Sequence, residues 1–311
     1  MGVDKNGVNR CLGASVATLL AVFGVLLILQ LSATLLGPPR NVCTKQVCLG
    51  KFLEGPPAFN NEAMANYLRA NYFTPPASTE YHLSGITGLD ENLQAVLQFI
   101  KEYFKSKRGG VFLDLGAGDG EYKSITLPLE RALGWSGLLV EPHPRLYQKL
   151  LKKARKAQAT RVCVSPYSYP AKMKLAHPKI KKGLSEEEEV AALGKTKVQV
   201  LWQMDKKETK NYELMEAQCV PLENIVYASG LTSLDLLVLD MAGNDLDLLL
   251  NTKLDELPET EMIVIRSNGE DISDDIAGYF LERNMVMKRV FGTKTTDAIY
   301  VLIKFDARRD M

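Results

Sequence analysis

The chain has 311 residues, which suffices for one large α/β domain with an appendage or for two modest domains. Its 46% hydrophobic and 24% charged residues are those of an ordinary globular protein with an apolar segment added. The net charge of +1 gives no reason to expect a nucleic-acid ligand, and we expect none. The three histidines are scattered along the chain, so we also expect no metal site.

The apolar segment is the run CLGASVATLLAVFGVLLILQLSATLL at 11–36, which contains no charged residue. It is long enough to cross a hydrocarbon core of about 30 Å as a helix. A cleaved signal peptide is the alternative, but its apolar core would span about 7–15 residues and end at a small-x-small site, which Leu31 spoils. We therefore expect a short tail at 1–10 on the inner side and an uncleaved single-pass anchor that contacts the lipid bilayer.

With this type II orientation, the rest of the chain faces the lumen or the outside. Cys43 and Cys48 then close a small disulfide loop in an oxidising space. In the alternative they are two free thiols in a cytosolic stalk. Cys11, Cys163 and Cys219 lie in apolar contexts, which predicts small buried hydrophobic side chains.

Residues 37–84 contain three Pro-Pro pairs and are predicted to form a stalk or linker with one short helix over 61–72. The globular domain is predicted over 85–311. It begins with an amphipathic helix over 89–104, which leads into the first strand.

The stretch VFLDLGAGDGEY at 111–122 carries the sharpest motif. A short buried strand is followed by Asp114, Gly116, Gly118 and Gly120 at alternate positions, as expected for a turn whose backbone a ligand can approach closely. The carboxylate of Asp114 can receive the ammonium group of an amino-acid moiety, such as that of S-adenosylmethionine. A purely structural turn is the alternative. We take these four residues as candidate cofactor-binding residues.

The second strand ends at Glu141, where a carboxylate is placed to accept hydrogen bonds from ribose hydroxyls. A simple strand terminator before proline is the alternative. A basic helix over 144–157 with a solvated outer face and a third strand over 161–165 follow. Residues 167–210 have the least pattern, and we expect a strand-poor, partly disordered insertion before a strand over 198–202.

The fourth strand ends at Asp240 and turns at Gly243 into a helix. In a doubly wound sheet its carboxyl end lies beside that of the first strand, so Asp240 would face the ligand. A helix cap is the alternative role. The remaining elements are a strand over 262–265, a helix over 272–284 and an antiparallel pair over 286–291 and 298–304. The pattern predicts a doubly wound α/β sheet that ends in an antiparallel hairpin.

A resemblance to a known family is carried by the runs FLDLGAGDGEY at 112–122, SITLPLER and LGWSGLLVEPHPRLYQKLL within 124–151, RVCVSP at 161–166 and DLLVLDMAGNDLDLLL at 235–250. Through these runs, residues 110–305 resemble the FkbM-type methyltransferase family, and most closely its membrane-anchored animal branch, typified by the insect Star protein. The resemblance implies a class I methyltransferase (Rossmann-like) fold, S-adenosylmethionine as cofactor and an N-terminal type II anchor. It also implies cofactor binding by Asp114, Gly116, Gly118 and Glu141.

Two departures from the family pattern affect the reaction face. The family reads Asp-Val-Glu-Gly-x-Glu after the fourth strand, where this chain has Ala242 for the first glutamate and Asp245 for the second. The fifth strand ends in Arg266-Ser267-Asn268 instead of near an acidic residue.

Two function classes follow. As an O-methyltransferase, the domain would use Asp240 or Asp245 to accept or relay a proton. As a catalytically silent methyltransferase fold, it would bind membrane protein cargo in ER-to-Golgi and endosomal vesicle transport, the process with which the Star branch is associated. Both place the protein in the endoplasmic reticulum, Golgi, endosome or plasma membrane.

Overall fold

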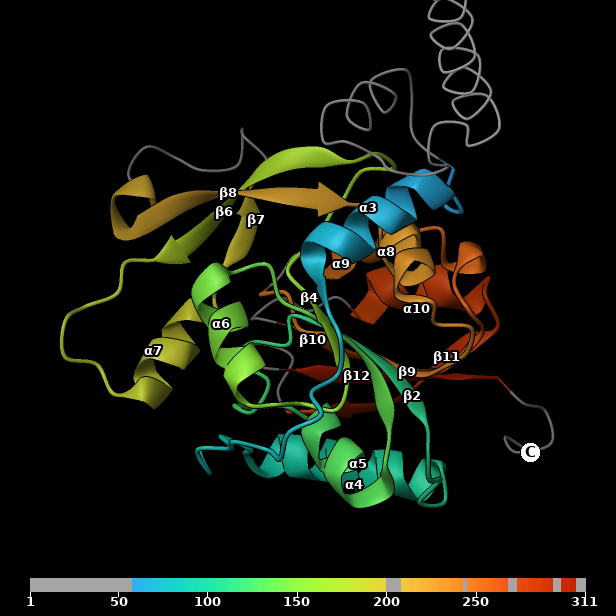
Figure 1. Ribbon diagram of the computed structural model, residues 1–311. Coiled ribbons are helices and arrows are strands. Elements are labelled where there is room, and N and C mark those ends of the chain that lie inside the picture. Colours follow the sequence, from blue (N-terminus) through green and yellow to red (C-terminus); the bar gives the residue numbers. More distant parts are fainter. Residues whose placement is uncertain (1–57, 200–207, 243–244, 268–272, 293–297, 306–311) are drawn as a thin grey trace, which may run out of the picture. The chain divides into compact units, whose positions relative to one another are not determined.

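The computed structural model describes residues 58–199, 208–242, 245–267, 273–292 and 298–305 (Figure 1). All of them fall within one compact unit. The predicted tail at 1–10, the anchor at 11–36, the first part of the stalk and the Cys43–Cys48 pair lie outside these ranges. In the described ranges, no helix combines the length and the hydrophobicity needed to cross a membrane.

The domain is built on an eight-stranded sheet of order β1-β4-β3-β2-β9-β10-β12-β11. Its five central strands, β4 to β10 in this order, run parallel to one another. β12 runs antiparallel to both β10 and β11 and forms the predicted C-terminal hairpin. The doubly wound sheet with a terminal hairpin is thus confirmed. The strands are β1 Phe73–Thr74, β2 Val111–Leu115, β3 Ser136–Val140, β4 Gln158–Thr160, β9 Leu234–Leu239, β10 Thr260–Arg266, β11 Met285–Phe291 and β12 Ile299–Lys304.

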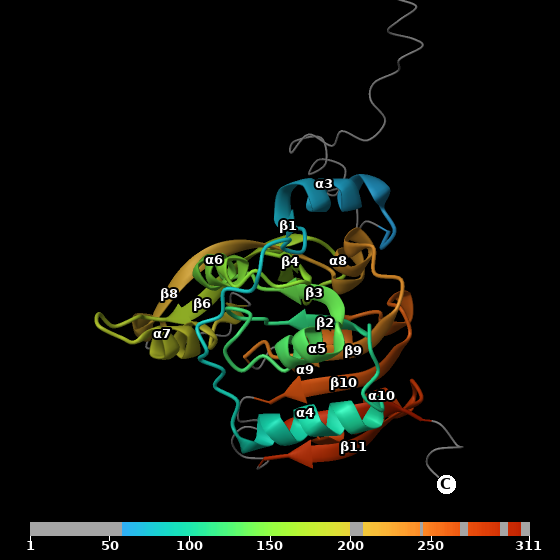
Figure 2. The same cartoon turned by 60° about the horizontal axis from the view of Figure 1, so that its bottom comes forward.

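Helices cover both faces of the sheet, because successive side chains of each strand point to opposite faces. Phe112 of β2 packs with α4 and α5, whereas Leu113 and Leu115 pack with α3, α8, α9 and α10. Figure 1 shows α4 and α5 together on one side and α3, α8 and α10 on the other. In Figure 2, α3 and α4 lie at opposite ends of the view. The helices are α3 Glu62–Tyr72, α4 Glu91–Tyr103, α5 Thr126–Leu133, α6 Pro144–Lys152, α8 Leu222–Ser229, α9 Asp245–Asn251 and α10 Ser273–Leu281, with short 3-10 turns at Glu208–Asn211 and Leu254–Glu256.

The segment before residue 85 is part of the domain, which corrects the predicted stalk for residues 58–84. Asn61 caps α3 by accepting a hydrogen bond from the Met64 N–H (2.9 Å). Met64 and Leu68 of α3 are buried in the core shared with α8. β1 then pairs antiparallel with β4 at the edge of the main sheet. The predicted short helix over 61–72 corresponds to α3, but the boundary at 85 was wrong because α3 packs into the core and β1 pairs with β4.

The region expected to be strand-poor is a second sheet of order β5-β8-β6-β7, which corrects that prediction. β6 pairs antiparallel with β8 over eight residue pairs. The predicted third strand over 161–165 was also misplaced, since β4 precedes it and β5 belongs to this second sheet. We call the segment 163–220 the insertion. It contains β5 Cys163–Val164, β6 Ala171–Pro178, α7 Glu186–Leu193, β7 Lys197–Gln199 and β8 Tyr212–Val220.

A disulfide joins Cys163 and Cys219. The two cysteines are register partners on the parallel strands β5 and β8. Both are buried, as predicted, but they are bonded to each other and are not simple apolar fillers. Sequence pattern missed the pair because its members are 56 residues apart and meet only through the second sheet.

Candidate functional site

The carboxyl ends of β2, β3 and β9 meet at one edge of the main sheet. The Gly116 N–H donates to the carbonyl of Val140 (3.0 Å), and the Asp240 N–H donates to that of Leu115 (2.9 Å). The residues that follow these three strands, which include Gly116, Glu141 and Asp240, therefore lie together. This is the point where the chain order of a doubly wound sheet reverses and where ligands bind in such folds.

Gly116 and Gly118 of the glycine turn are each favoured for a different physical reason. Gly116 has φ +84°, and a Cβ there would lie 2.0 Å from the carbonyl oxygen of Asp240. Gly118 also has positive φ, but a Cβ there would meet nothing within 4 Å. Gly116 is thus required by packing of the turn against β9, whereas Gly118 borders open space that a ligand can enter.

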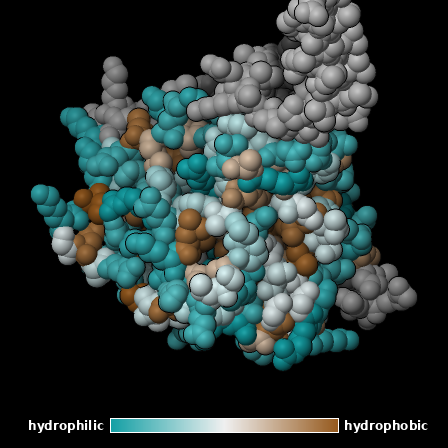
Figure 3. All heavy atoms as spheres, viewed as in Figure 1, coloured by the Kyte–Doolittle hydropathy of each residue, from teal (hydrophilic) through white to brown (hydrophobic). Residues whose placement is uncertain are grey.

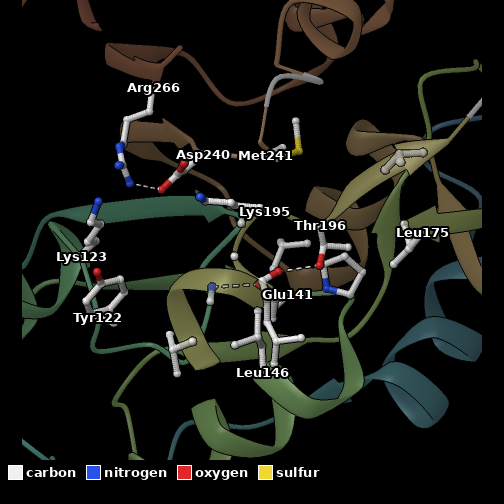
Figure 4. Close-up of a pocket in the computed structure, with 18 of the residues that line it drawn as sticks. Tyr122, Lys123, Glu141, Leu146, Leu175, Lys195, Thr196, Asp240, Met241 and Arg266 are labelled. Atoms are coloured by element: carbon white, nitrogen blue, oxygen red, sulfur yellow. Dashed lines mark hydrogen bonds and ion pairs between the residues drawn. The ribbon is translucent and has the colours of Figure 1, made fainter. Parts of the chain in front are cut away.

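Glu141 follows β3 and is buried, with 5% of its surface exposed. Its Oε2 accepts a hydrogen bond from the Gly118 N–H (2.9 Å), and its Oε1 accepts one from the His143 N–H (2.8 Å). Burial raises the pKa of Glu141 to about 8, although both backbone donors favour the charged form. The side chain lines the main cavity beside the glycine turn (Figure 4).

Asp114 lies within β2 and not after it. Its Oδ2 accepts a hydrogen bond from the Thr126 hydroxyl of α5 (2.6 Å). Burial raises its pKa to about 6. Asp114 lines a small cavity of about 20 Å³ that shares Gly116, Lys123 and Asp240 with the main cavity. Asp114 is therefore not among the residues that line the main cavity, although its place in the motif predicted direct contact with the ligand.

Asp240 follows β9 and forms an ion pair with Arg266 at the end of β10. It lies five residues before Asp245, the first residue of α9, which is too far for the N-cap of that helix. The alternative role as a helix cap is therefore excluded. The side chain of Asp245 lies outside the described residues, so its proposed part in the reaction stays a prediction.

The main cavity has a volume of about 370 Å³ and two different ends (Figure 4). One end is charged and is lined by Lys123, Lys195, Asp240 and Arg266. In Figure 4, Leu146 and Leu175 lie away from these charged side chains, on the side that we call the apolar end. Apolar residues of the lining include Leu146, Val164, Leu175, Val190, Leu193 and Val198.

The sequence pattern did not identify Arg155, which stabilises the glycine turn through hydrogen bonds. Its buried guanidinium donates to the carbonyl of Gly120, to the Thr126 hydroxyl (3.2 Å) and to Glu130 (3.1 Å). The sequence predicts a basic helix over 144–157 that includes Arg155, but α6 ends at Lys152 and Arg155 is buried. No local pattern marks such a residue.

Glu121, just after the glycine turn, was also missed. Its carboxylate pairs with Lys153 (2.8 Å) and accepts hydrogen bonds from the backbone N–H groups of Ser84 and Gly85 (both 2.7 Å). It thereby fastens the segment before α4 to the turn.

Residues 114–298 match the model of the methyltransferase FkbM domain. The chain belongs to this family. The matched region thus spans the glycine turn, the insertion and β11, and it ends one residue before β12 of the C-terminal hairpin. None of the curated proteins matches the chain.

Several solved structures are similar to it. A putative RNA methyltransferase from Pyrococcus horikoshii has 12% identity and a TM-score of 0.37, and the match covers 80% of this chain and all of that one. TrmK of M. capricolum, in complex with S-adenosylhomocysteine, has 12% identity and a TM-score of 0.35 over 70% of this chain and 69% of that one. A putative tRNA (m1A22) methyltransferase of Streptococcus pneumoniae, in complex with S-adenosyl-L-methionine, has 15% identity and a TM-score of 0.35 over 70% and 76%.

Proposed function

We propose that this FkbM domain binds S-adenosylmethionine in the main cavity and transfers its methyl group to an oxygen atom of an acceptor. The observation that carries the proposal is Glu141, a buried carboxylate that lines a cavity of about 370 Å³ beside a glycine turn with open space at Gly118. An acid at this place after the second parallel strand suits ribose hydroxyls. Family membership supports the same ligand.

The residues present fit the two halves of this cofactor. Glu141 would accept hydrogen bonds from the ribose, and the apolar end of the cavity would hold the adenine ring. Asp114 and Lys123, of opposite charge, line the small adjoining cavity and would hold the ammonium and carboxylate groups. When bound, the cofactor supplies an electrophilic methyl group on sulfur.

Asp240 would lie at the reaction end, but its carboxylate is already paired with Arg266. Accepting a proton there would break that ion pair. We therefore assign Asp240 to positioning through Arg266, and we retain Asp245 as a candidate proton acceptor.

Calorimetric titration of the full-length chain with S-adenosylmethionine tests the proposal. Glu141→Ala should weaken binding at least tenfold, because it removes a buried acceptor from the ribose. Glu216→Ala, an exposed carboxylate of β8, is the matched control and should bind as the parent does. Absence of heat at high micromolar ligand, with a folded protein, would refute the proposal.

We further propose that the protein is anchored in a membrane through residues 11–36, with the domain on the lumenal or outer side, as in the Star-like branch. The apolar run supports the anchor. The Cys163–Cys219 disulfide supports the oxidising side, because disulfides rarely persist in the cytosol.

A catalytically silent domain that binds cargo in vesicle transport is the second candidate, and the Asp240–Arg266 pair is the observation that favours it. Apolar cargo binding gains no support from the face shown in Figure 3, where hydrophobic side chains are scattered among hydrophilic ones. Asp114→Ala and Asp240→Ala separate the candidates. An enzyme loses cofactor affinity with the first and turnover with the second, whereas a cargo-binding protein keeps cargo surface delivery with both.

A further inference from the structure

Three cations surround the reaction end of the main cavity. Lys123 follows the glycine turn, Lys195 lies between α7 and β7 of the insertion, and Arg266 ends β10. Figure 4 shows the amino group of Lys195 directed toward the side of the cavity where Asp240 and Arg266 lie. Segments far apart in sequence thus bring positive charge to one place.

The carboxylates of the same lining do not balance this charge. Asp240 is paired with Arg266, and burial raises the pKa of Glu141 to about 8, which favours its neutral form. Within the described ranges, neither Lys123 nor Lys195 forms an ion pair; the Lys123 ammonium contacts only the ring of Tyr122, 5.8 Å from its centroid. Both lysines are available to a ligand.

Binding of the methyl donor would leave part of this positive charge unpaired. Its single carboxylate has a partner in Lys123, which also lines the small cavity with Asp114. Its sulfonium brings a further positive charge to the same end. Lys195, beside Arg266, then remains for the second substrate.

We propose that the acceptor is a carboxylate, held by Lys195 beside Arg266, and that its oxygen receives the methyl group. The inference rests on the proposed function and names its substrate class. The carboxylate oxygen forms the O–CH3 bond while the S–CH3 bond breaks, and the electron pair of that bond goes to sulfur. An anion and a sulfonium become a neutral methyl ester and a neutral thioether, so no proton moves.

This chemistry suits the described lining, which offers no unengaged base. The Asp240 carboxylate holds Arg266, the two oxygens of Glu141 each accept a backbone N–H, and burial raises the pKa of Tyr122. A hydroxyl acceptor would need one of these groups, or Asp245, whose side chain lies outside the described residues, to take its proton. A carboxylate arrives without one.

The binding test uses the full-length chain saturated with S-adenosylhomocysteine and titrated with succinate at constant ionic strength. Succinamide, the uncharged analogue, is the control ligand. Lys195→Gln should weaken succinate binding about five- to tenfold, because it removes a charge-assisted contact. Lys197→Gln removes an exposed lysine of β7 that does not line the cavity and should leave binding unchanged. Equal succinate affinity in the two variants would overturn the inference. So would a parent chain that binds succinamide as tightly as succinate.

The methylated atom is identified with donor labelled in its methyl group and a membrane extract as the source of acceptor. Methyl esters release the label as methanol in alkali, and we expect that result; label that survives alkali would overturn the inference. Donor binding without succinate tests the proposed function separately. A chain that binds the donor but not succinate keeps the proposed function and loses its carboxylate acceptor.

Discussion

Gly116 and Gly118 are two residues apart in one turn, yet the structure gives their substitution by alanine different costs. A Cβ at Gly116 would meet the backbone of Asp240, which cannot rotate away, and the residue also has positive φ. We expect Gly116→Ala to lower the free energy of unfolding by about 2–5 kcal/mol. Gly118→Ala meets no neighbour and should cost only about 1–2 kcal/mol, the penalty of its positive φ. Urea unfolding of both variants checks this, and equal midpoints would contradict it.

Glu141 should make nucleoside binding depend on pH. Ribose hydroxyls donate to a carboxylate more strongly than to a carboxylic acid, so binding favours the ionised form. Burial raises the pKa of Glu141 to about 8 in the ligand-free protein. Adenosine affinity should therefore rise as the pH increases from 6 and level off above about 8. Adenosine is the suitable ligand, since it carries the ribose without the ionisable amino-acid end. The glutamine in Glu141→Gln cannot ionise, so the adenosine affinity of this variant should not change over the same pH range. A pH dependence as steep as that of the parent would contradict this account.

Single-residue roles were predictable only where they are local in sequence. Gly116, Gly118 and Glu141 follow apolar runs, and all three line the main cavity. Gly120 is not among the described residues that line it; its carbonyl accepts a hydrogen bond from Arg155. Arg155 and Lys195 reach the site from connecting segments, through folding that no nearby spacing records. A residue that is exposed by pattern and buried by tertiary contact cannot be found from periodicity alone.

At the scale of elements, the central strands were predictable because buried parallel strands read as continuous apolar runs. β9, with the sequence LDLLVL, is an example. β6 and β8 were missed because charged residues such as Lys172, Lys174 and Glu216 alternate with apolar ones. That alternation is the mark of an antiparallel sheet with one face in solvent, and it was overlooked within a segment rich in charge.

The disulfide should stabilise the insertion and the cavity together, because Cys163 belongs to both the second sheet and the cavity lining. Replacing both cysteines by alanine should lower the free energy of unfolding by about 2–5 kcal/mol. It should also weaken donor binding. The parent treated with a reductant should behave like the double variant, and the double variant itself should not respond to the reductant. An unchanged melting midpoint in the reduced parent would show that the bond is dispensable.

At the scale of the whole molecule, the disulfide and the apolar run make a joint prediction about topology. Protease added to sealed microsomes that contain the full-length chain should leave the domain intact until detergent is added. In the proposed topology, the disulfide would lie on the oxidising side and the apolar run at 11–36 would hold the domain at the membrane. Digestion without detergent would place the domain in the cytosol, beside the source of S-adenosylmethionine.

β1 and α3 determine at which residue a well-behaved fragment of the domain can begin. β4 would otherwise present unpaired N–H and C=O groups at the edge of the main sheet, and such edges recruit strands of other chains. β1 covers this edge, while Met64 and Leu68 of α3 fill the apolar surface beside α8. A fragment that starts at residue 85, where the sequence places the boundary, would open both surfaces at once and should self-associate. A fragment that starts at residue 58 keeps them closed and should stay monodisperse.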